Sequence, residues 1–238
     1  MFRFRLCNSN RFDTTSSIVR LSAVAIFCYK EPSRSATKTL YLMKTLFFDI
    51  ETVPTAAAIA ENGLDSPQRQ LDEQELIKKL SLSAITARIL CLAYAAEPPH
   101  DAPIAVLQGE ESEILKDFWQ LALETNLFVG HNLLDFDLRF IYQRSIINQI
   151  KPSREIPFAR FRNAPVFDTM HEWGRWGREH VGLDPLAKAL QLPSPKAGMD
   201  GSKVFEYFRS GRQAEIYQYC KGDVETVRQV YRRLTFTT

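Results

Sequence analysis

Apolar and polar residues follow two spacings along the chain, one typical of strands and the other of helices. Residues 45–53 (TLFFDIETV) form a mostly apolar run bounded by Pro54, which predicts a first strand. Residues 87–96 and 103–109 predict two more strands, and the turn-forming EPPHDA between them favours a hairpin. Helical spacing in residues 66–80 predicts a helix between the first and second strands.

The second half of the chain alternates between predicted helices and strands. Helices are predicted at residues 111–124, 136–146 and 213–234, and strands at residues 126–132 and 165–170, the last followed by mostly helical sequence. Three early strands followed by this alternation predict an α/β fold, a mixed five-stranded sheet with helices on both faces. No internal repeat or low-complexity linker divides the sequence. We therefore expect one domain over residues 43–238.

The composition describes a soluble globular protein with a substantial core. The hydrophobic fraction is 45%, and no apolar run approaches the roughly 18–20 residues that a membrane helix needs. The four cysteines lie far apart and form no C-x-x-C pair, which argues against a zinc knuckle or a disulfide framework. This spacing fits a reducing compartment, so we expect a cytoplasmic protein. No phosphate-binding loop of the Walker or G-x-G-x-x-G type is present.

The positive charge of the chain is concentrated in residues 1–42. This segment holds seven Lys or Arg residues against two acidic ones, a net charge of +5, whereas the whole chain carries +2. Residues 43–238 therefore carry −3. A transit peptide is one interpretation of the segment. The sequence MKTLFFDIET after it favours another, in which Met43 is the natural start and residues 1–42 are disordered or misassigned.

Asp49 and Glu51, inside the first predicted strand, are the first candidate functional residues. Residues two apart on a strand project from the same face, so the two carboxylates should point together. Two close negative charges repel, and a divalent cation such as Mg²⁺ or Mn²⁺ would remove the repulsion. The alternative is a strand end at which both acids face water.

Asp135 and Asp137 follow the fourth predicted strand, at the sheet edge where ligands of α/β proteins usually bind. Either residue could instead serve the next helix, Asp135 as its N-cap and Asp137 by stabilising the helix dipole.

Tyr219 and Asp223 lie four residues apart on the last predicted helix and therefore share one face. Gly222 between them costs about 1 kcal/mol relative to Ala inside a helix, which is easier to understand if the backbone passes close to something. The alternative is a half-buried tyrosine beside a solvated acid.

Taken in chain order, the three clusters resemble the motifs of the DEDD superfamily of 3′→5′ exonucleases, which have an RNase H-like fold. The motifs match as FDIET (48–52), NLLDFD (132–137) and YCKGD (219–223). Gln218, and not a His, lies five residues before Asp223, so the tyrosine subclass fits. FDIETVP and KAGMDGSKV are most similar to stand-alone bacterial exonucleases related to the proofreading domains of family B DNA polymerases. The resemblance covers about residues 43–234.

The resemblance implies hydrolysis of phosphodiester bonds with two divalent metal ions, Mg²⁺ or Mn²⁺, about 3.5–4 Å apart. Asp49 would bridge both ions. Glu51 and Asp223 would complete the site on the nucleophile side, and Asp137 would hold the other ion. Tyr219 would orient the attacking water, because a phenol with a pKa near 10 is a poor general base.

The implied substrate is the 3′ end of single-stranded nucleic acid, released as 5′-mononucleotides, and the polymerase-like resemblance favours DNA over RNA. Five residues are candidates for substrate binding: Thr52, Asn132, Phe136, Ser202 and Lys203. A role in proofreading or DNA repair would need a polymerase or repair factor as a partner in trans.

Three alternatives stay open at this point: an exoribonuclease similar to RNase D, a catalytically decayed nucleic-acid-binding module of the same fold, and a non-nuclease with structural ion pairs. The complete set of four acids and a tyrosine argues against decay. FFDIETVP contains no Lys or Arg that could pair with its acids, which argues against the third alternative.

Overall fold

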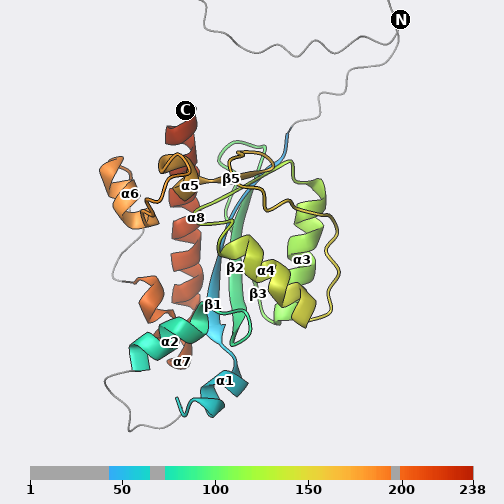
Figure 1. The fold of residues 1–238 in the computed structure, drawn as a ribbon, viewed down its shortest axis with the longest axis vertical. Helices are drawn as coiled ribbons and strands as arrows, with labels where there is room; N and C mark the ends of the chain where they lie inside the picture. Colours follow the sequence, from blue (N-terminus) through green and yellow to red (C-terminus); the bar gives the residue numbers. More distant parts are fainter. Residues whose placement is uncertain (1–42, 65–72, 194–198, 238) are drawn as a thin grey trace, which may run out of the picture. The chain divides into compact units, whose positions relative to one another are not determined.

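β1, Thr45–Pro54, is the central strand of a five-stranded sheet (Figure 1). β2 (Ala87–Glu97) pairs antiparallel with one side of β1, and β4 (Leu127–Gly130) pairs parallel with the other. β3 (Ala105–Gln108) and β5 (Val166–Asp168) are the edge strands, so the order is β3-β2-β1-β4-β5. The mixed α/β sheet of an RNase H-like fold is therefore confirmed, including the antiparallel pairing of the second and third strands.

The structure is a computed structural model, and it describes residues 43–64, 73–193 and 199–237. The expected N-terminal extension, residues 1–42, lies outside the described residues. So does the first part of the helix expected over residues 66–80, whose described part is α2 (Glu73–Ser81).

Helices cover both faces of the sheet (Figure 1). α3 (Glu111–Glu124) and α4 (Asp137–Ile147) pack on one face, and α8 (Gln213–Thr235) lies along the other. The buried residues of α8 include Ile216, Cys220, Val224 and Val227. This helical spacing directs one apolar stripe of α8 at the sheet.

Shorter helices complete the chain, and their bounds differ from the predicted ones. α1 (Ala56–Glu61) was not predicted; Thr55 caps it by accepting a hydrogen bond of 3.2 Å from the backbone amide of Ala58. The helical sequence after β5 is divided into α5 (Thr169–Trp173), α6 (Leu183–Ala189), the 3₁₀ helix η1 (Gly201–Lys203) and α7 (Val204–Arg209). None of the described helices is long and apolar enough to cross a membrane.

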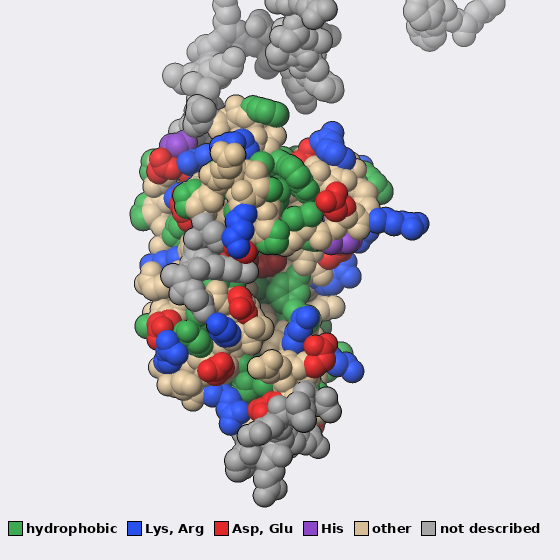
Figure 2. Space-filling model, turned by 90° about the vertical axis from the view of Figure 1, so that its left-hand side faces the viewer, with side chains coloured by type: hydrophobic (Ala, Val, Ile, Leu, Met, Phe, Trp, Pro, Cys, Tyr) green, Lys and Arg blue, Asp and Glu red, His purple; other side chains and the backbone are tan. Residues whose placement is uncertain are grey.

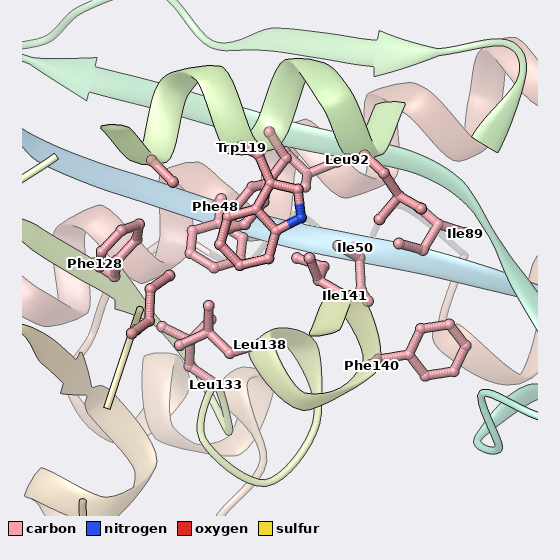
Figure 3. Close-up of a cluster of buried hydrophobic side chains, with 14 of the residues drawn as sticks. Phe48, Ile50, Ile89, Leu92, Trp119, Phe128, Leu133, Leu138, Phe140 and Ile141 are labelled. Carbon is pink, nitrogen blue, oxygen red and sulfur yellow. The ribbon is translucent and has the colours of Figure 1, made fainter. Parts of the chain in front are cut away.

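The alternation of side chains along β1 separates the core into two clusters. Phe48 and Ile50 point toward α3 and α4 (Figure 3). The ring centroids of Phe48 and Phe118 are 5.3 Å apart. Phe47 and Val53 point to the other side, toward α8. Burial of Phe47, Phe48 and Phe118 contributes roughly 1.5–3 kcal/mol per side chain to folding.

A bulge in β2 lies opposite the acidic part of β1. Glu51 is paired with Cys91 and Thr52 with Ile89, so Leu90 is the extra residue. Leu90 and Cys91 consequently both pack into the cluster under α8. The bulge thus places a thiol next to Glu51.

Candidate active site

Asp49 and Glu51 point to the α8 side of β1, as the alternation predicts. Their carboxylate oxygens and Sγ of Cys220 on α8 all lie within 4.8 Å of one another. Only 9% of Glu51 is exposed, and within the described residues its carboxylate forms neither a hydrogen bond nor a salt bridge. The interpretation that both acids simply face water is therefore wrong for Glu51.

Asp137 reaches the same site from the other side of β1. β4 ends at Gly130 and pairs with residues 45–47 of β1, so among the described residues the later part of β1 has no neighbouring strand on this side. Asp137 occupies this position at the first residue of α4, and its Oδ1 accepts a hydrogen bond of 3.1 Å from the backbone amide of Ile50. Since Asp137 is 3% exposed, a second acid is buried at the site.

The loop between β4 and α4 is held by Asp168, which the sequence analysis did not single out. Its Oδ1 accepts a hydrogen bond of 3.0 Å from the amide of Asn132, and its Oδ2 accepts one of 3.0 Å from Leu134. The same carboxylate caps α5 by accepting from the amides of Met170 and His171. An Asp at the end of a strand and directly before a helix is the signal that could have found it.

Asn132 adopts a left-handed backbone conformation, with φ of 64°. Asn tolerates this conformation better than most residues. The backbone amide of Asn132 also donates the hydrogen bond that Asp168 accepts. These observations give Asn132 a structural role in shaping the loop. Its role in substrate binding stays a prediction.

Asp135 does not cap α4, so that interpretation was wrong. The residue before the helix is Phe136, which makes no side-chain capping bond. Asp135 instead pairs with Arg160 at 2.9 Å and with Nε2 of His171 at 3.1 Å. These partners direct its carboxylate away from any role as the helix cap.

α8 contributes Tyr219, Cys220 and Asp223 and continues through Gly222 without a break. The Tyr219 hydroxyl hydrogen-bonds to Asp223. Burial is the largest cause that raises the pKa of Tyr219 far above its usual value, and the charges of Asp223 and Glu51 add to it. The hydroxyl therefore stays protonated at neutral pH.

The charges of the acids act on one another. Burial raises the pKa of Asp49 well above its usual value, and repulsion from Asp137, Asp223 and Glu51 raises it further. The pKa of Glu51 is likewise raised by burial, then by Cys91, Asp223 and Asp137. Burial raises the pKa of Asp137 to about 8, although the hydrogen bond from Ile50 opposes this.

No basic side chain in the described part of the chain balances the negative charge of Asp49, Glu51 or Asp137. Among the described residues, none of these three acids forms a salt bridge with Lys or Arg. Structural ion pairing, the third alternative from the sequence, is therefore unsupported for them. Carboxylate oxygens are the ligands that hard divalent cations prefer, and a cation would remove both the repulsion and the need for protons. This acidic cluster fits a divalent metal ion.

A pocket of about 330 Å³ opens beside Glu51. Three of the substrate-binding candidates line it, namely Thr52, Phe136 and Ser202. The hydroxyl of Thr52 donates to the carbonyl oxygen of Ser81 at 2.8 Å, which ties β1 to the end of α2. The other two candidates, Asn132 and Lys203, are not among the described lining residues.

The pocket also contains residues that the sequence analysis missed. Lys78 on α2 and Phe205 on α7 bring a cation and an aromatic ring to its wall. Neither belongs to a motif, so no sequence signal indicated them. Figure 2 views the molecule from the left-hand side of Figure 1 and shows a hollow in this face. Acidic and hydrophobic side chains lie inside the hollow, and Lys and Arg side chains surround it.

Comparisons with known proteins agree with this geometry. A family model described as a predicted 3′–5′ exonuclease related to the exonuclease domain of PolB matches residues 101–238, more than half of the chain. The matched segment contains Asp137, Tyr219 and Asp223. No curated protein matches the chain. The chain belongs to this family of 3′–5′ exonucleases, and is thus a hydrolase that acts on nucleic acid.

Proposed function

We propose that residues 43–238 form an exonuclease domain that removes 5′-mononucleotides from the 3′ end of single-stranded DNA, with two divalent cations, Mg²⁺ or Mn²⁺, as cofactors. One observation carries the proposal: carboxylates from β1, α4 and α8 converge beside a pocket, and those of β1 and α4 have no basic partner among the described residues. Membership of the exonuclease family supports the reaction class.

The metal ligands would be Asp49, Glu51, Asp137 and Asp223. When bound, two cations would activate the attacking water and stabilise charge on the leaving 3′-oxygen. Asp137 is oriented for this role by the Ile50 amide.

Tyr219 would position the water rather than take its proton. Its raised pKa keeps the hydroxyl protonated, and its bond to Asp223 fixes where the hydroxyl points. A neutral phenol in this position can donate one hydrogen bond and accept another, which suits orientation.

The pocket beside Glu51 would receive the terminal nucleotide. Phe136 and Phe205 offer aromatic surfaces for base stacking, which is worth about 1–3 kcal/mol per base and tolerates any sequence. Lys78 would pair with a phosphate. A single strand is favoured because stacking on these rings needs an unpaired base.

The test is digestion of a 5′-labelled single-stranded DNA oligonucleotide with Mg²⁺ or Mn²⁺, beside an RNA of the same sequence. We expect a ladder of products shortened from the 3′ end, with DNA degraded faster, and no products in EDTA or with Asp49→Ala. Asp117→Ala, which removes an exposed acid of α3, is the matched control and should behave like the wild type. Internal cuts, or cleavage that survives in EDTA, would refute the proposal, and faster digestion of RNA would refute its choice of substrate.

A further inference from the structure

Cys220 lies against the acidic cluster, yet the proposed exonuclease reaction does not use it. Its side chain is completely buried on α8, between Tyr219 and Asp223 in the chain. Its Sγ is 3.7 Å from Oδ2 of Asp49 and 3.5 Å from the backbone oxygen of the same residue. A sulfur ligand is therefore placed beside oxygen ligands.

The spacing of these atoms suits a tetrahedral metal ion. Zinc binds thiolate sulfur at about 2.3 Å and carboxylate oxygen at about 2.0–2.2 Å, so neighbouring sulfur and oxygen ligands are roughly 3.6 Å apart. The observed separation of 3.7 Å between Cys220 and Asp49 agrees with this value. Glu51 completes a set of three ligand atoms within 4.8 Å.

A second observation points to a bound cation at the same place. Glu51 is nine-tenths buried, lines the pocket, and has no hydrogen-bond or salt-bridge partner among the described residues. A carboxylate buried in this way is costly without a positive charge. Cys220 decides which cation suits it, because thiolate favours zinc-like ions while Mg²⁺ and Mn²⁺ prefer oxygen ligands.

We propose that Asp49, Glu51 and Cys220 form a binding site for Zn²⁺ and similar soft or borderline divalent ions. The site shares Asp49 and Glu51 with the proposed exonuclease site, so Zn²⁺ competes there with Mg²⁺ or Mn²⁺; this consequence rests on the proposed function. When the metal–sulfur bond forms, the thiol proton is released to the solvent and nothing is oxidised or reduced.

The test uses the full chain with Cys7→Ser and Cys28→Ser, which leaves Cys91 and Cys220 as the remaining thiols. Titration with Cd²⁺, a spectroscopic substitute for Zn²⁺, is followed by the ultraviolet charge-transfer band of a cadmium–thiolate bond. We expect a saturable band at one equivalent. Cys220→Ser should abolish the band and weaken Zn²⁺ binding in calorimetry by about tenfold or more, since the soft ligand is lost.

Cys91→Ser tests the competing thiol, because Cys91 is equally buried, lies opposite Glu51 in the sheet and hydrogen-bonds with Cys220. This variant should keep the band. A band that persists in Cys220→Ser, or that Cys91→Ser abolishes, overturns the proposal. If Cys220→Ser does not fold, Asp49→Asn provides the same test: cadmium affinity should fall by about tenfold or more, and an unchanged affinity overturns the proposal.

The two proposals fail separately. Metal titration without nucleic acid tests this site, while digestion of the oligonucleotide with Mg²⁺ tests the exonuclease. Activity without a cadmium–thiolate band would overturn only the zinc-type site. A band without activity would overturn only the exonuclease proposal, together with the competition that rests on it.

Discussion

The backbone amide of Ile50 donates a hydrogen bond to Oδ1 of Asp137, although the two residues are 87 positions apart in the chain. Ile50 lies between Asp49 and Glu51, so this bond ties the start of α4 to the acidic part of β1. The bond is available because β4 ends early, and no other strand in the described part of the chain pairs with this side of β1. Asp137 therefore combines a structural contact with a predicted metal-binding role, and the two can be separated by mutation.

Asp137→Asn should preserve the contact with Ile50 but remove a charged metal ligand. The amide oxygen of Asn can accept the same hydrogen bond, so we expect the free energy of unfolding without metal to change by less than about 1.5 kcal/mol. Activity should fall by more than about 100-fold, because a metal ligand is weakened. Denaturant unfolding and the oligonucleotide assay measure the two effects. Equal activity of Asp137→Asn and the wild type would contradict the predicted role.

The stability of the metal-free protein should fall as pH rises. Asp137 has a pKa of about 8 in the folded protein and near 4 when unfolded, so the folded state binds the proton more tightly. Its contribution is fully present below about pH 4 and is lost as the pH rises through about 8. The raised pKa values of Asp49 and Glu51 act in the same direction.

Thermal unfolding in EDTA between about pH 6 and 9 tests this expectation. Tm should fall over the range, and Mg²⁺ or Mn²⁺ should oppose the fall because the cation replaces the protons. Asp137→Asn should show a shallower decline. The half-buried His131, whose pKa is lowered by desolvation, works in the opposite sense but only below its ordinary pKa. A Tm that rises steadily to pH 9 in EDTA would show that these acids do not hold protons.

Asp168→Ala should both destabilise the protein and reduce its activity. The mutation leaves the amides of Asn132 and Leu134 without their acceptor and removes the cap of α5. We expect a loss of about 2–4 kcal/mol in the free energy of unfolding. Asp117→Ala, at an exposed position, should change it by less than about 0.5 kcal/mol. Equal stability of the two variants would mean that Asp168 does not hold the loop.

Tyr219→Phe should slow the reaction far less than Asp49→Ala does. Removing the hydroxyl loses the orientation of the water, for which we expect a decrease in kcat of less than about 100-fold. Removing Asp49 disrupts metal binding and should cost more than about 1000-fold. Single-turnover assays at saturating Mg²⁺ separate the two. Comparable losses would instead assign proton transfer to Tyr219.

Local patterns in the sequence determined most of the elements and part of the site. Alternation along β1 predicts that Asp49 and Glu51 share a face, and the four-residue spacing of Tyr219 and Asp223 predicts a shared face of α8. These inferences succeed because strand and helix periodicities are properties of the backbone. α3 was predicted with its observed bounds for the same reason.

Only the tertiary structure decided which side chains meet. Cys220 lies next to Asp49 because α8 packs on β1 in one particular rotation, and the two residues are 171 positions apart. Asp168, at the end of β5, holds the loop between β4 and α4. Lys78 and Phe205 reach the pocket from helices outside the motifs. Such contacts depend on how whole elements pack against each other. Periodicity defines the buried face of an element but not the partner residues that it meets there.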